Sequence, residues 1–181
     1  MTAPLLARLH VRSLRNLEPL DWSPGAGRHL LLGDNGAGKT SVLESVYILA
    51  TTRSFRTPRL ADCVRHSARG QGGTDGFEIV GEVEGARRAR LSVRWSRAQG
   101  LDRAVNDKNT PLSEHLSVLP VVAWTAADVE TLTGAPALRR RFLDRGVVST
   151  RPAVLEVISR YRQALTHKRD LLGRPRPSAA E

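Results

Sequence analysis

A glycine-rich run near the N-terminus has the residue types and the spacing that bind phosphate groups. It fits the pattern G-x-x-x-x-G-K-[ST] with Gly33, Asp34, Asn35, Gly36, Ala37, Gly38, Lys39 and Thr40. The glycines allow the backbone to wrap around a phosphate without Cβ clashes, and the N–H groups then point inward as an anion nest. We expect Lys39 to reach the β- and γ-phosphates and the Thr40 hydroxyl to bind Mg²⁺. The run therefore predicts a phosphate-binding loop (P-loop) and a nucleotide site.

The flanking sequence predicts the two elements that position this loop. Residues 28–32 form a short apolar run, which predicts a strand that ends at a glycine. After the loop, apolar residues recur at helical spacing and predict a helix over residues 39–51 with one buried face. These residues are Val42, Leu43, Val46, Tyr47 and Ala50. A helix that begins near Lys39 would direct the positive end of its dipole at the bound phosphates.

Patterns along the rest of the chain predict strands first and helices last. The predicted strands are residues 5–12, 17–22, 77–83, 90–95 and 101–105, with 77–95 forming a hairpin. Two more apolar segments predict a short helix at 60–66 and a buried strand at 118–124. Beyond Pro136 the pattern is helical to Leu172 with one break near residues 150–152. The proline-containing end at 174–178 cannot continue a helix.

The sequence offers no recognisable catalytic residue. Hydrolysis by a P-loop protein needs an acidic residue at the end of a second apolar strand, where it holds Mg²⁺ and a water. Asp128 lies four residues beyond the predicted strand at 118–124, a spacing that favours a helix N-terminus instead. The histidines lack the i, i+4 pairing of a metal-binding helix, and we expect each to lie in the core or on the surface. They are His10, His29, His66, His115 and His167.

Basic residues exceed acidic residues by ten, and most of the excess lies in the last quarter of the chain. Residues 137–181 carry 11 basic and 4 acidic side chains, against 17 and 14 in residues 1–136. Arginine presents a planar fork of donors suited to phosphate, so this segment favours a nucleic-acid partner. The lone Cys63 excludes a disulfide framework, and no apolar run is long enough for a membrane span. Arg8 interrupts the apolar residues that a signal peptide needs, so we expect a cytoplasmic protein.

Several segments, taken in order, resemble the RecF family of bacterial DNA replication and repair proteins. The first are Leu14-Arg15-Asn16, the P-loop with residues 41–50, and Thr52-Arg53-Ser54-Phe55-Arg56-Thr57. Residues 134–145, with the run Arg139-Arg140-Arg141-Phe142-Leu143-Asp144-Arg145, and residues 161–165 also match. The resemblance covers essentially the whole chain, and several motifs in one order are more specific than a P-loop alone.

This resemblance implies an α/β fold: a P-loop NTPase of the ABC/SMC class, here an incomplete ATPase head with a mixed sheet, an antiparallel β-subdomain and a helical C-terminal segment. Residues 1–135 would form the N-terminal part of the head, and residues 136–181 the start of a helical second lobe. ATP and Mg²⁺ are the implied cofactors, and an ATP-dependent homodimer is implied for the full-length family. The implied role is recombinational repair, replication and the SOS response. DNA with single-stranded regions, gaps or junctions and the mediators RecO and RecR are the implied partners, in the nucleoid-associated cytoplasm.

The sequence departs from the family pattern mainly in length. The family continues for about as many residues again, and its Walker B acid and ABC signature lie in that second half. Residues 124–128 also lack the aromatic-x-Pro-Glu-Asp run that the family shows, and Leu138 stands where an acidic residue is common. ATPase activity therefore follows from the resemblance and from no residue of this chain.

Two other functions stay open from the residues themselves. One is a non-catalytic nucleic-acid-binding module that keeps the P-loop as a relic. The other is a P-loop kinase, against which the order of strands and the lack of an acceptor-site acid argue.

Individual arginines give further expectations. Arg15 would lie near the nucleotide or on the ordinary surface. Arg53 and Arg56 would cap the carbonyls at the end of the P-loop helix or bind DNA, and the cap is the preferred interpretation. Arg139 or Arg140 would pair with Asp144 at helical spacing.

Overall fold

The computed structural model describes residues 3–65 and 75–173. Its first part holds strands β1 (Leu5–Arg12) and β2 (Leu20–Trp22), helix α1 (Lys39–Thr51) and the 3₁₀ turn η1 (Leu60–Cys63). Strands β3 (Gly76–Glu84), β4 (Ala89–Ser96) and β5 (Gly100–Val105) follow. The remaining elements are α2 (Leu112–Val118), η3 (Ala126–Val129), α3 (Glu130–Thr133), α4 (Pro136–Thr150) and α5 (Val154–Gly173). Strands therefore come before helices, as the sequence patterns predict.

The five strands form one sheet in the order β2-β1-β3-β4-β5. Every neighbouring pair is antiparallel. The described strands therefore match the expected antiparallel β-subdomain, and they include no parallel pair of the expected mixed sheet. The predicted hairpin is present and pairs Phe77 of β3 with Trp95 of β4. β1 lies beside β3, with Leu9 opposite Gly81, although these two residues are 72 positions apart in sequence. β1 is thus an inner strand, and its C-terminal end delivers residues 13–17 to the start of α1.

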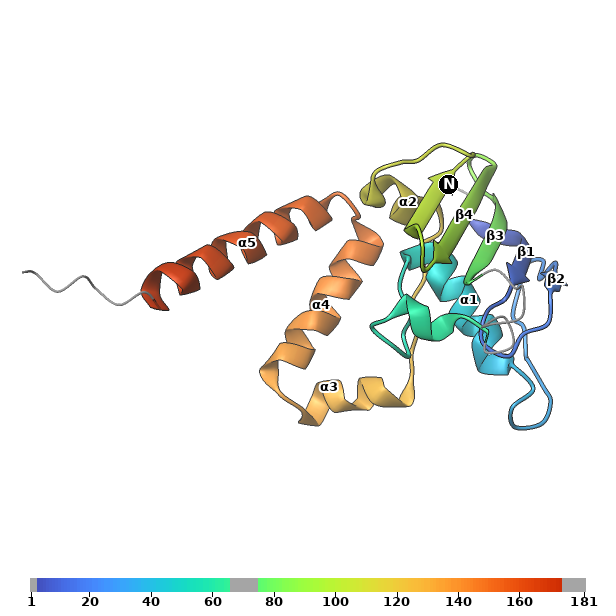
Figure 1. Cartoon of the computed structure of the whole chain (residues 1–181), viewed down its shortest axis with the longest axis horizontal. Coiled ribbons are helices and arrows are strands. Elements are labelled where there is room, and N and C mark those ends of the chain that lie inside the picture. The colour runs from blue at the N-terminus through green and yellow to red at the C-terminus, as the bar shows by residue number, and fades with distance from the viewer. Residues whose placement is uncertain (1–2, 66–74, 174–181) are drawn as a thin grey trace, which may run out of the picture.

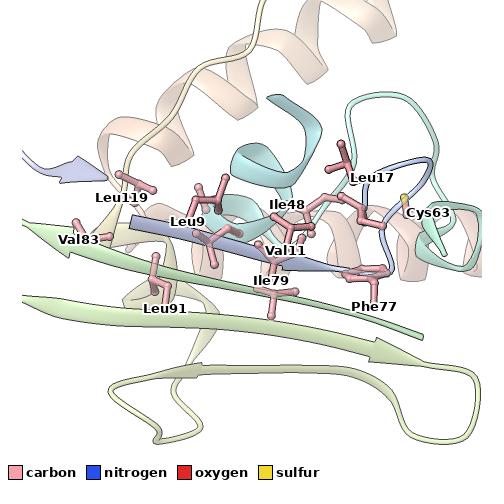
Figure 2. Close-up of a cluster of buried hydrophobic side chains, with 14 of the residues drawn as sticks. Leu9, Val11, Leu17, Ile48, Cys63, Phe77, Ile79, Val83, Leu91 and Leu119 are labelled. Carbon is pink, nitrogen blue, oxygen red and sulfur yellow. The ribbon is translucent and has the colours of Figure 1, made fainter. Parts of the chain in front are cut away.

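A hydrophobic core fills the space between α1 and one face of the sheet (Figure 2). Leu9, Val11 and Ile79 point to this face from β1 and β3, and Ile48 and Leu49 meet them from α1. All five side chains are fully buried. Each such side chain contributes about 1.5–3 kcal/mol on burial. This layer therefore fixes α1 on the sheet, together with the loop that precedes it.

The opposite face of the sheet carries charges of both signs. Arg8 pairs with Asp21 at 2.6 Å, and Arg94 pairs with Glu78 at 2.7 Å. These side chains alternate with the buried residues along the strands, as expected for a sheet with one solvated face. Because these two arginines have acidic partners, they contribute little net attraction for a phosphate backbone.

The predicted strand at residues 28–32 is wrong. The segment has no helical or strand structure, and Leu30 and Leu32 are 80% and 81% exposed. A strand needs a neighbour that accepts and donates backbone hydrogen bonds. None of the strands within the described ranges pairs with this segment. The apolar run marks a segment suited to burial, but nothing described here covers it.

The predicted buried strand at 118–124 is also wrong. The chain forms α2 up to Val118 and then runs without regular structure, with Val122 82% and Trp124 66% exposed. Leu112, Leu116 and Leu119 recur at helical spacing, which explains the helix in place of the start of the strand. Two other predicted elements are present but shorter: β2 begins at Leu20, and the helix predicted at 60–66 is the turn η1.

Two long helices follow: α4 runs from α3 back toward α2, and α5 extends away from the sheet (Figure 1). They end and begin on either side of residues 151–153, where the sequence predicts a break. No α5 side chain is buried, and Arg162 of α5 pairs with Asp144 of α4 at 2.6 Å. The predicted pair of Asp144 with Arg139 or Arg140 is therefore replaced by a contact between helices. Within the described ranges no helix could span a membrane. The proline-containing end at 174–178 and His66 lie outside the described residues.

Candidate nucleotide-binding site

The predicted P-loop is an open turn in front of α1. Gly33, Gly36 and Gly38 have φ angles of 148°, 88° and 94°, which lie in the region that favours glycine. A Cβ on Gly36 would meet no atom within 4 Å, so the loop leaves an open cradle there. A Cβ on Gly38 would lie 2.8 Å from Leu17 Cδ2, so this glycine also permits close contact with the end of β1. The helix begins at Lys39, and its N-terminal N–H groups face the loop.

Lys39 folds back over this loop. Its Nζ donates hydrogen bonds to the carbonyl oxygens of Gly33 at 2.7 Å and Asp34 at 2.8 Å. Thr40, the expected Mg²⁺ ligand, is exposed. The cation and the hydroxyl that a bound triphosphate with Mg²⁺ would require are thus both at the mouth of the cradle, and the residues present fit that ligand.

Asn16 connects the end of β1 to both sides of the P-loop. Its Nδ2 donates to the Gly36 carbonyl at 2.5 Å, and its Oδ1 accepts from the Ser41 hydroxyl at 2.8 Å. Ser41 is buried at the first turn of α1. Asn16 therefore holds the loop against the helix that starts it.

A cavity of about 680 Å³ opens beside the loop. Lys39 and Thr40 of the P-loop line it, and so do Arg15, Arg56 and Arg65, which we call the arginine wall. A site of this size holds a small-molecule ligand. Arg15 and Arg56 share the single carboxylate of Glu44, and Arg65 pairs with Glu18, so the three arginines leave an excess of positive charge that a polyphosphate requires.

Two arginines of this wall, Arg15 and Arg56, are held by Glu44 of α1, a fully buried carboxylate. Arg15 donates to it through Nε at 2.9 Å and Nη2 at 2.8 Å, and Arg56 Nη1 lies at 3.3 Å. The Ser54 hydroxyl donates at 2.5 Å, and the Cys63 thiol lies at 3.7 Å. Burial alone would raise the pKa of Glu44, but the hydrogen bonds from Arg15 and Ser54 and the nearby positive charges outweigh it, so its pKa lies below the ordinary value. Glu44 is therefore ionised and paired.

Cys63 is buried in the same group of side chains. Burial is the main reason that its pKa rises to about 11, and the neighbouring Glu44 charge raises it further. The thiol is consequently protonated at neutral pH and serves as a weak donor, which excludes a reactive thiolate.

The structure answers the expectations for three arginines. Arg15 lines the cavity, half-buried, with its Nη1 on the Asp62 carbonyl at 2.7 Å. Arg56 pairs with Glu44, so the preferred interpretation as a cap of the α1 carbonyls is wrong. The helix instead ends at Thr52, which adopts φ 59° and donates its N–H to the Ile48 carbonyl. The side chain of Arg53 is exposed.

Asp128 and His115 have structural roles and do not lie in the cavity. Asp128 closes a capping box with Thr125 at the start of η3, as its spacing predicted. Burial alone would raise the pKa of Asp128, but hydrogen bonds from Thr125 and the charge of Arg145 lower it. His115 is buried with Nε2 2.7 Å from the Leu49 carbonyl, and burial lowers its pKa. No group of three or more potential metal-binding side chains occurs in residues 3–65 and 75–173.

Sequence reasoning missed Glu44 and Asn16 as parts of the site. Both stand within segments that match a family pattern, but neither belongs to the P-loop motif. An acidic residue on the buried face of a predicted helix is the signal that could have identified Glu44, because a buried carboxylate requires partners.

Curated relatives of the chain are named DNA replication and repair protein RecF. The relative from Chromohalobacter salexigens is 37% identical over 176 residues, which are 96% of this chain and 47% of the relative. The relative from Myxococcus xanthus is 35% identical over 92% of this chain and 43% of its own length. The chain thus spans about half the length of the curated relatives it matches. No protein-family model matches it.

Solved structures share the fold. The recombination mediator protein RecF with ATP, from the RecFOR pathway, gives a TM-score of 0.80 at 21% identity and covers 96% of this chain and 47% of its own. The Smc head domain from Pyrococcus yayanosii gives a TM-score of 0.61 at 15% identity over 93% of this chain and 38% of its own. The predicted fold class is confirmed: the chain has part of a P-loop ATPase head of the ABC/SMC class. By sequence and by fold, it is a homologue of the RecF proteins that matches about half of their length.

Proposed function

We propose that the chain binds ATP with Mg²⁺ through Gly33–Thr40. The observation that carries this proposal is the open glycine cradle at the start of α1, with Lys39 at its mouth and a cavity lined by arginines beside it. The loop N–H groups and Gly36 would surround a phosphate, and Lys39 would exchange its loop carbonyls for phosphate oxygens. The Thr40 hydroxyl would bind Mg²⁺, which neutralises charge on the phosphates.

Binding is better supported than hydrolysis. Among the described residues that line the cavity, Asp62 is the only carboxylate, and its Oδ2 already accepts from the Thr57 hydroxyl at 2.7 Å. It lies in the turn η1 and not at the end of a strand, where the acid of a P-loop ATPase is expected. The cavity therefore supplies groups that hold a triphosphate and no evident group that activates a water.

The DNA-related role is part of the same proposal. The relatives are named for DNA replication and repair, and the α4–α5 segment carries Arg140, Arg141 and Arg151 without an ion pair among the described residues. We infer a role in recombinational repair and the SOS response, with single-stranded or gapped DNA and RecO- and RecR-type mediators as partners. The two proposed units are residues 1–135, part of the ATP-binding head, and 136–181, a helical lobe. For a full-length protein we add an ATP-dependent homodimer, in the cytoplasm at the nucleoid.

Thermal unfolding with and without Mg-ATP tests the nucleotide site. A ligand at 100 times its Kd adds about 2.7 kcal/mol to a protein that binds it only when folded. For a chain of this size we expect the wild-type Tm to rise by about 5–11 °C. Lys39→Ala should fold and lose this rise, because the cradle loses its cation. Lys108→Ala, which removes an exposed lysine outside the cavity, should keep it.

Each outcome separates the two leading functions. A rise that Lys39→Ala retains would contradict the role assigned to the P-loop. A cooperative wild-type transition that is indifferent to ATP, together with DNA affinity that falls steeply with salt, would favour the nucleic-acid-binding module with a relic loop. The lack of a suitably placed catalytic acid among the described residues of the cavity keeps this second function open.

A further inference from the structure

Glu44 is more heavily paired than its burial alone requires. A buried carboxylate is costly unless it is paired and hydrogen-bonded, and the two bonds from Arg15 already satisfy that need. Arg56 and Ser54 nevertheless converge on the same two oxygens. An apolar side chain would fill the position at less cost, so the arrangement has its clearest effect on the direction of the two guanidinium groups.

The segments that meet at Glu44 are those that form the cavity wall. The Arg15 N–H donates to the Cys63 carbonyl at 2.7 Å, which joins the residues after β1 to η1. The Ser54 hydroxyl donates to Glu44 and accepts from the amides of Arg56 and Thr57, which fixes the turn after α1. Glu44 itself does not line the cavity, whereas Arg15 and Arg56 do. The carboxylate therefore lies behind the wall and holds its cationic side chains from the rear.

Lys39 and Glu44 share one helix, which links the P-loop to the arginine wall. Glu44 follows Lys39 by five positions, which correspond to about 7.5 Å along the helix axis. Because α1 is anchored in the core by Ile48 and Leu49, the separation between the P-loop cation and the arginine wall is set by a rigid element. Cations that are already in place need no reorganisation when a polyphosphate arrives.

We propose that Glu44 is a positioning residue of the nucleotide site, which orients Arg15 and Arg56 toward the ligand held by the P-loop. The inference rests on the proposed binding of ATP and adds a requirement that the P-loop motif does not contain. Glu44 touches no ligand, so its effect passes through the two arginines.

The test compares the Kd of Mg-ATP for Glu44→Gln, Glu44→Asp and the wild type. Glutamine keeps the shape and removes the charge, so ATP affinity should fall about tenfold or more, the range seen when a partner that orients a ligating group is lost. Aspartate keeps the charge on the arginines and should recover much of that loss. Glu18→Gln is the matched control, because it removes a carboxylate from Arg65, another arginine of the cavity, at an exposed pair. Its affinity should stay within about twofold of the wild type.

Three results would overturn the proposal: a folded Glu44→Gln variant with wild-type affinity, one with tighter binding, or Glu44→Asp as weak as Glu44→Gln. Tighter binding would mean that Glu44 only neutralises positive charge, and equal losses would mean that keeping the negative charge does not restore the affinity, as expected for a general disturbance of the buried site. If Glu44→Gln does not fold, Ser54→Ala takes its place, and unchanged affinity in that variant contradicts the proposal. If the wild type itself does not bind ATP, the proposed function fails as well. A difference between the wild type and Lys39→Ala without a Glu44 effect removes this inference alone.

Discussion

Asn16 offers a direct test of how the P-loop is held. Replacing it with alanine removes the hydrogen bond to the Gly36 carbonyl and the bond from the Ser41 hydroxyl. Ser41 is 3% exposed, so water cannot readily replace the lost acceptor, whereas Gly36 is exposed and its carbonyl can be hydrated. The two bonds should therefore contribute unequally.

The expected cost follows from these two environments. A typical hydrogen bond contributes about 0.5–1.5 kcal/mol net, and a buried group left without a partner costs about 1–3 kcal/mol. We expect Asn16→Ala to lower the free energy of unfolding by about 1.5–3 kcal/mol, most of it from the Ser41 side. For this chain length the Tm should fall by about 3–12 °C. ATP affinity should fall too, because the loop loses its connection to β1.

A double-mutant cycle measured by denaturant unfolding checks the reasoning. Asn16→Ala and Ser41→Ala should be less than additive, since the second change removes a hydroxyl that the first leaves unpaired. Asn109→Ala, an exposed asparagine in the turn after β5, is the matched control and should have little effect. A loss below about 0.5 kcal/mol for Asn16→Ala, or strict additivity in the cycle, would refute the proposed connection.

Two further predictions concern the core beneath the site. Burial raises the pKa of Cys63 from its ordinary value of 9.0 to about 11, so over this range the folded thiol stays neutral while the unfolded thiol ionises. The stability that the thiol contributes is therefore lost as the pH rises from about 9 to 11. The difference in unfolding free energy between wild type and Cys63→Ala should shrink by about 2–3 kcal/mol over that window, and a constant difference would contradict the burial of the thiol. A Cβ on Gly81 would lie 2.3 Å from Leu49 Cδ2 and 3.0 Å from Leu6 Cδ1, so Gly81→Ala should destabilise the fold by about 1–3 kcal/mol in denaturant unfolding. Gly146 lies in α4, and a Cβ added to it would have no atom within 4 Å. Gly146→Ala should therefore stabilise the fold by about 0.5–1 kcal/mol, and similar effects of the two substitutions would contradict this difference in packing.

Elements with a local signal were predictable from the sequence. Helix α1 has the bounds that the sequence predicts, because the glycine loop defines its start and its apolar spacing is helical throughout. The β3–β4 hairpin follows from alternation on both sides of a short turn. The strand prediction for residues 28–32 was wrong because an apolar run indicates a need for burial but does not identify the neighbouring strand that would provide it. The strand prediction for residues 118–124 was wrong because Leu112, Leu116 and Leu119 continue the helical spacing of α2 into the same apolar run.

The candidate site was predictable only in its P-loop. The role of Glu44 depends on its hydrogen-bond partners Arg15, Ser54 and Cys63, which lie 29, 10 and 19 residues away in the sequence. No spacing rule predicts such a meeting, since it depends on how β1, α1 and η1 pack. Arg56 shows the same limit. Its place after the end of α1 favours a cap of the helix carbonyls, but its side chain pairs with the buried carboxylate of Glu44.

The fold-back of Lys39 makes ligand binding at the P-loop an exchange of partners. Without a ligand, the Lys39 ammonium group is already bound to two carbonyl oxygens of the loop, which take the place of the phosphate oxygens. A charged hydrogen bond contributes about 1.5–3 kcal/mol, and an incoming anion must return at least what Lys39 gives up. A monovalent anion offers one weak replacement, whereas adjacent phosphates offer several strong ones. The resting loop thereby sets a threshold of charge, which discriminates against the small anions that outnumber nucleotides in solution.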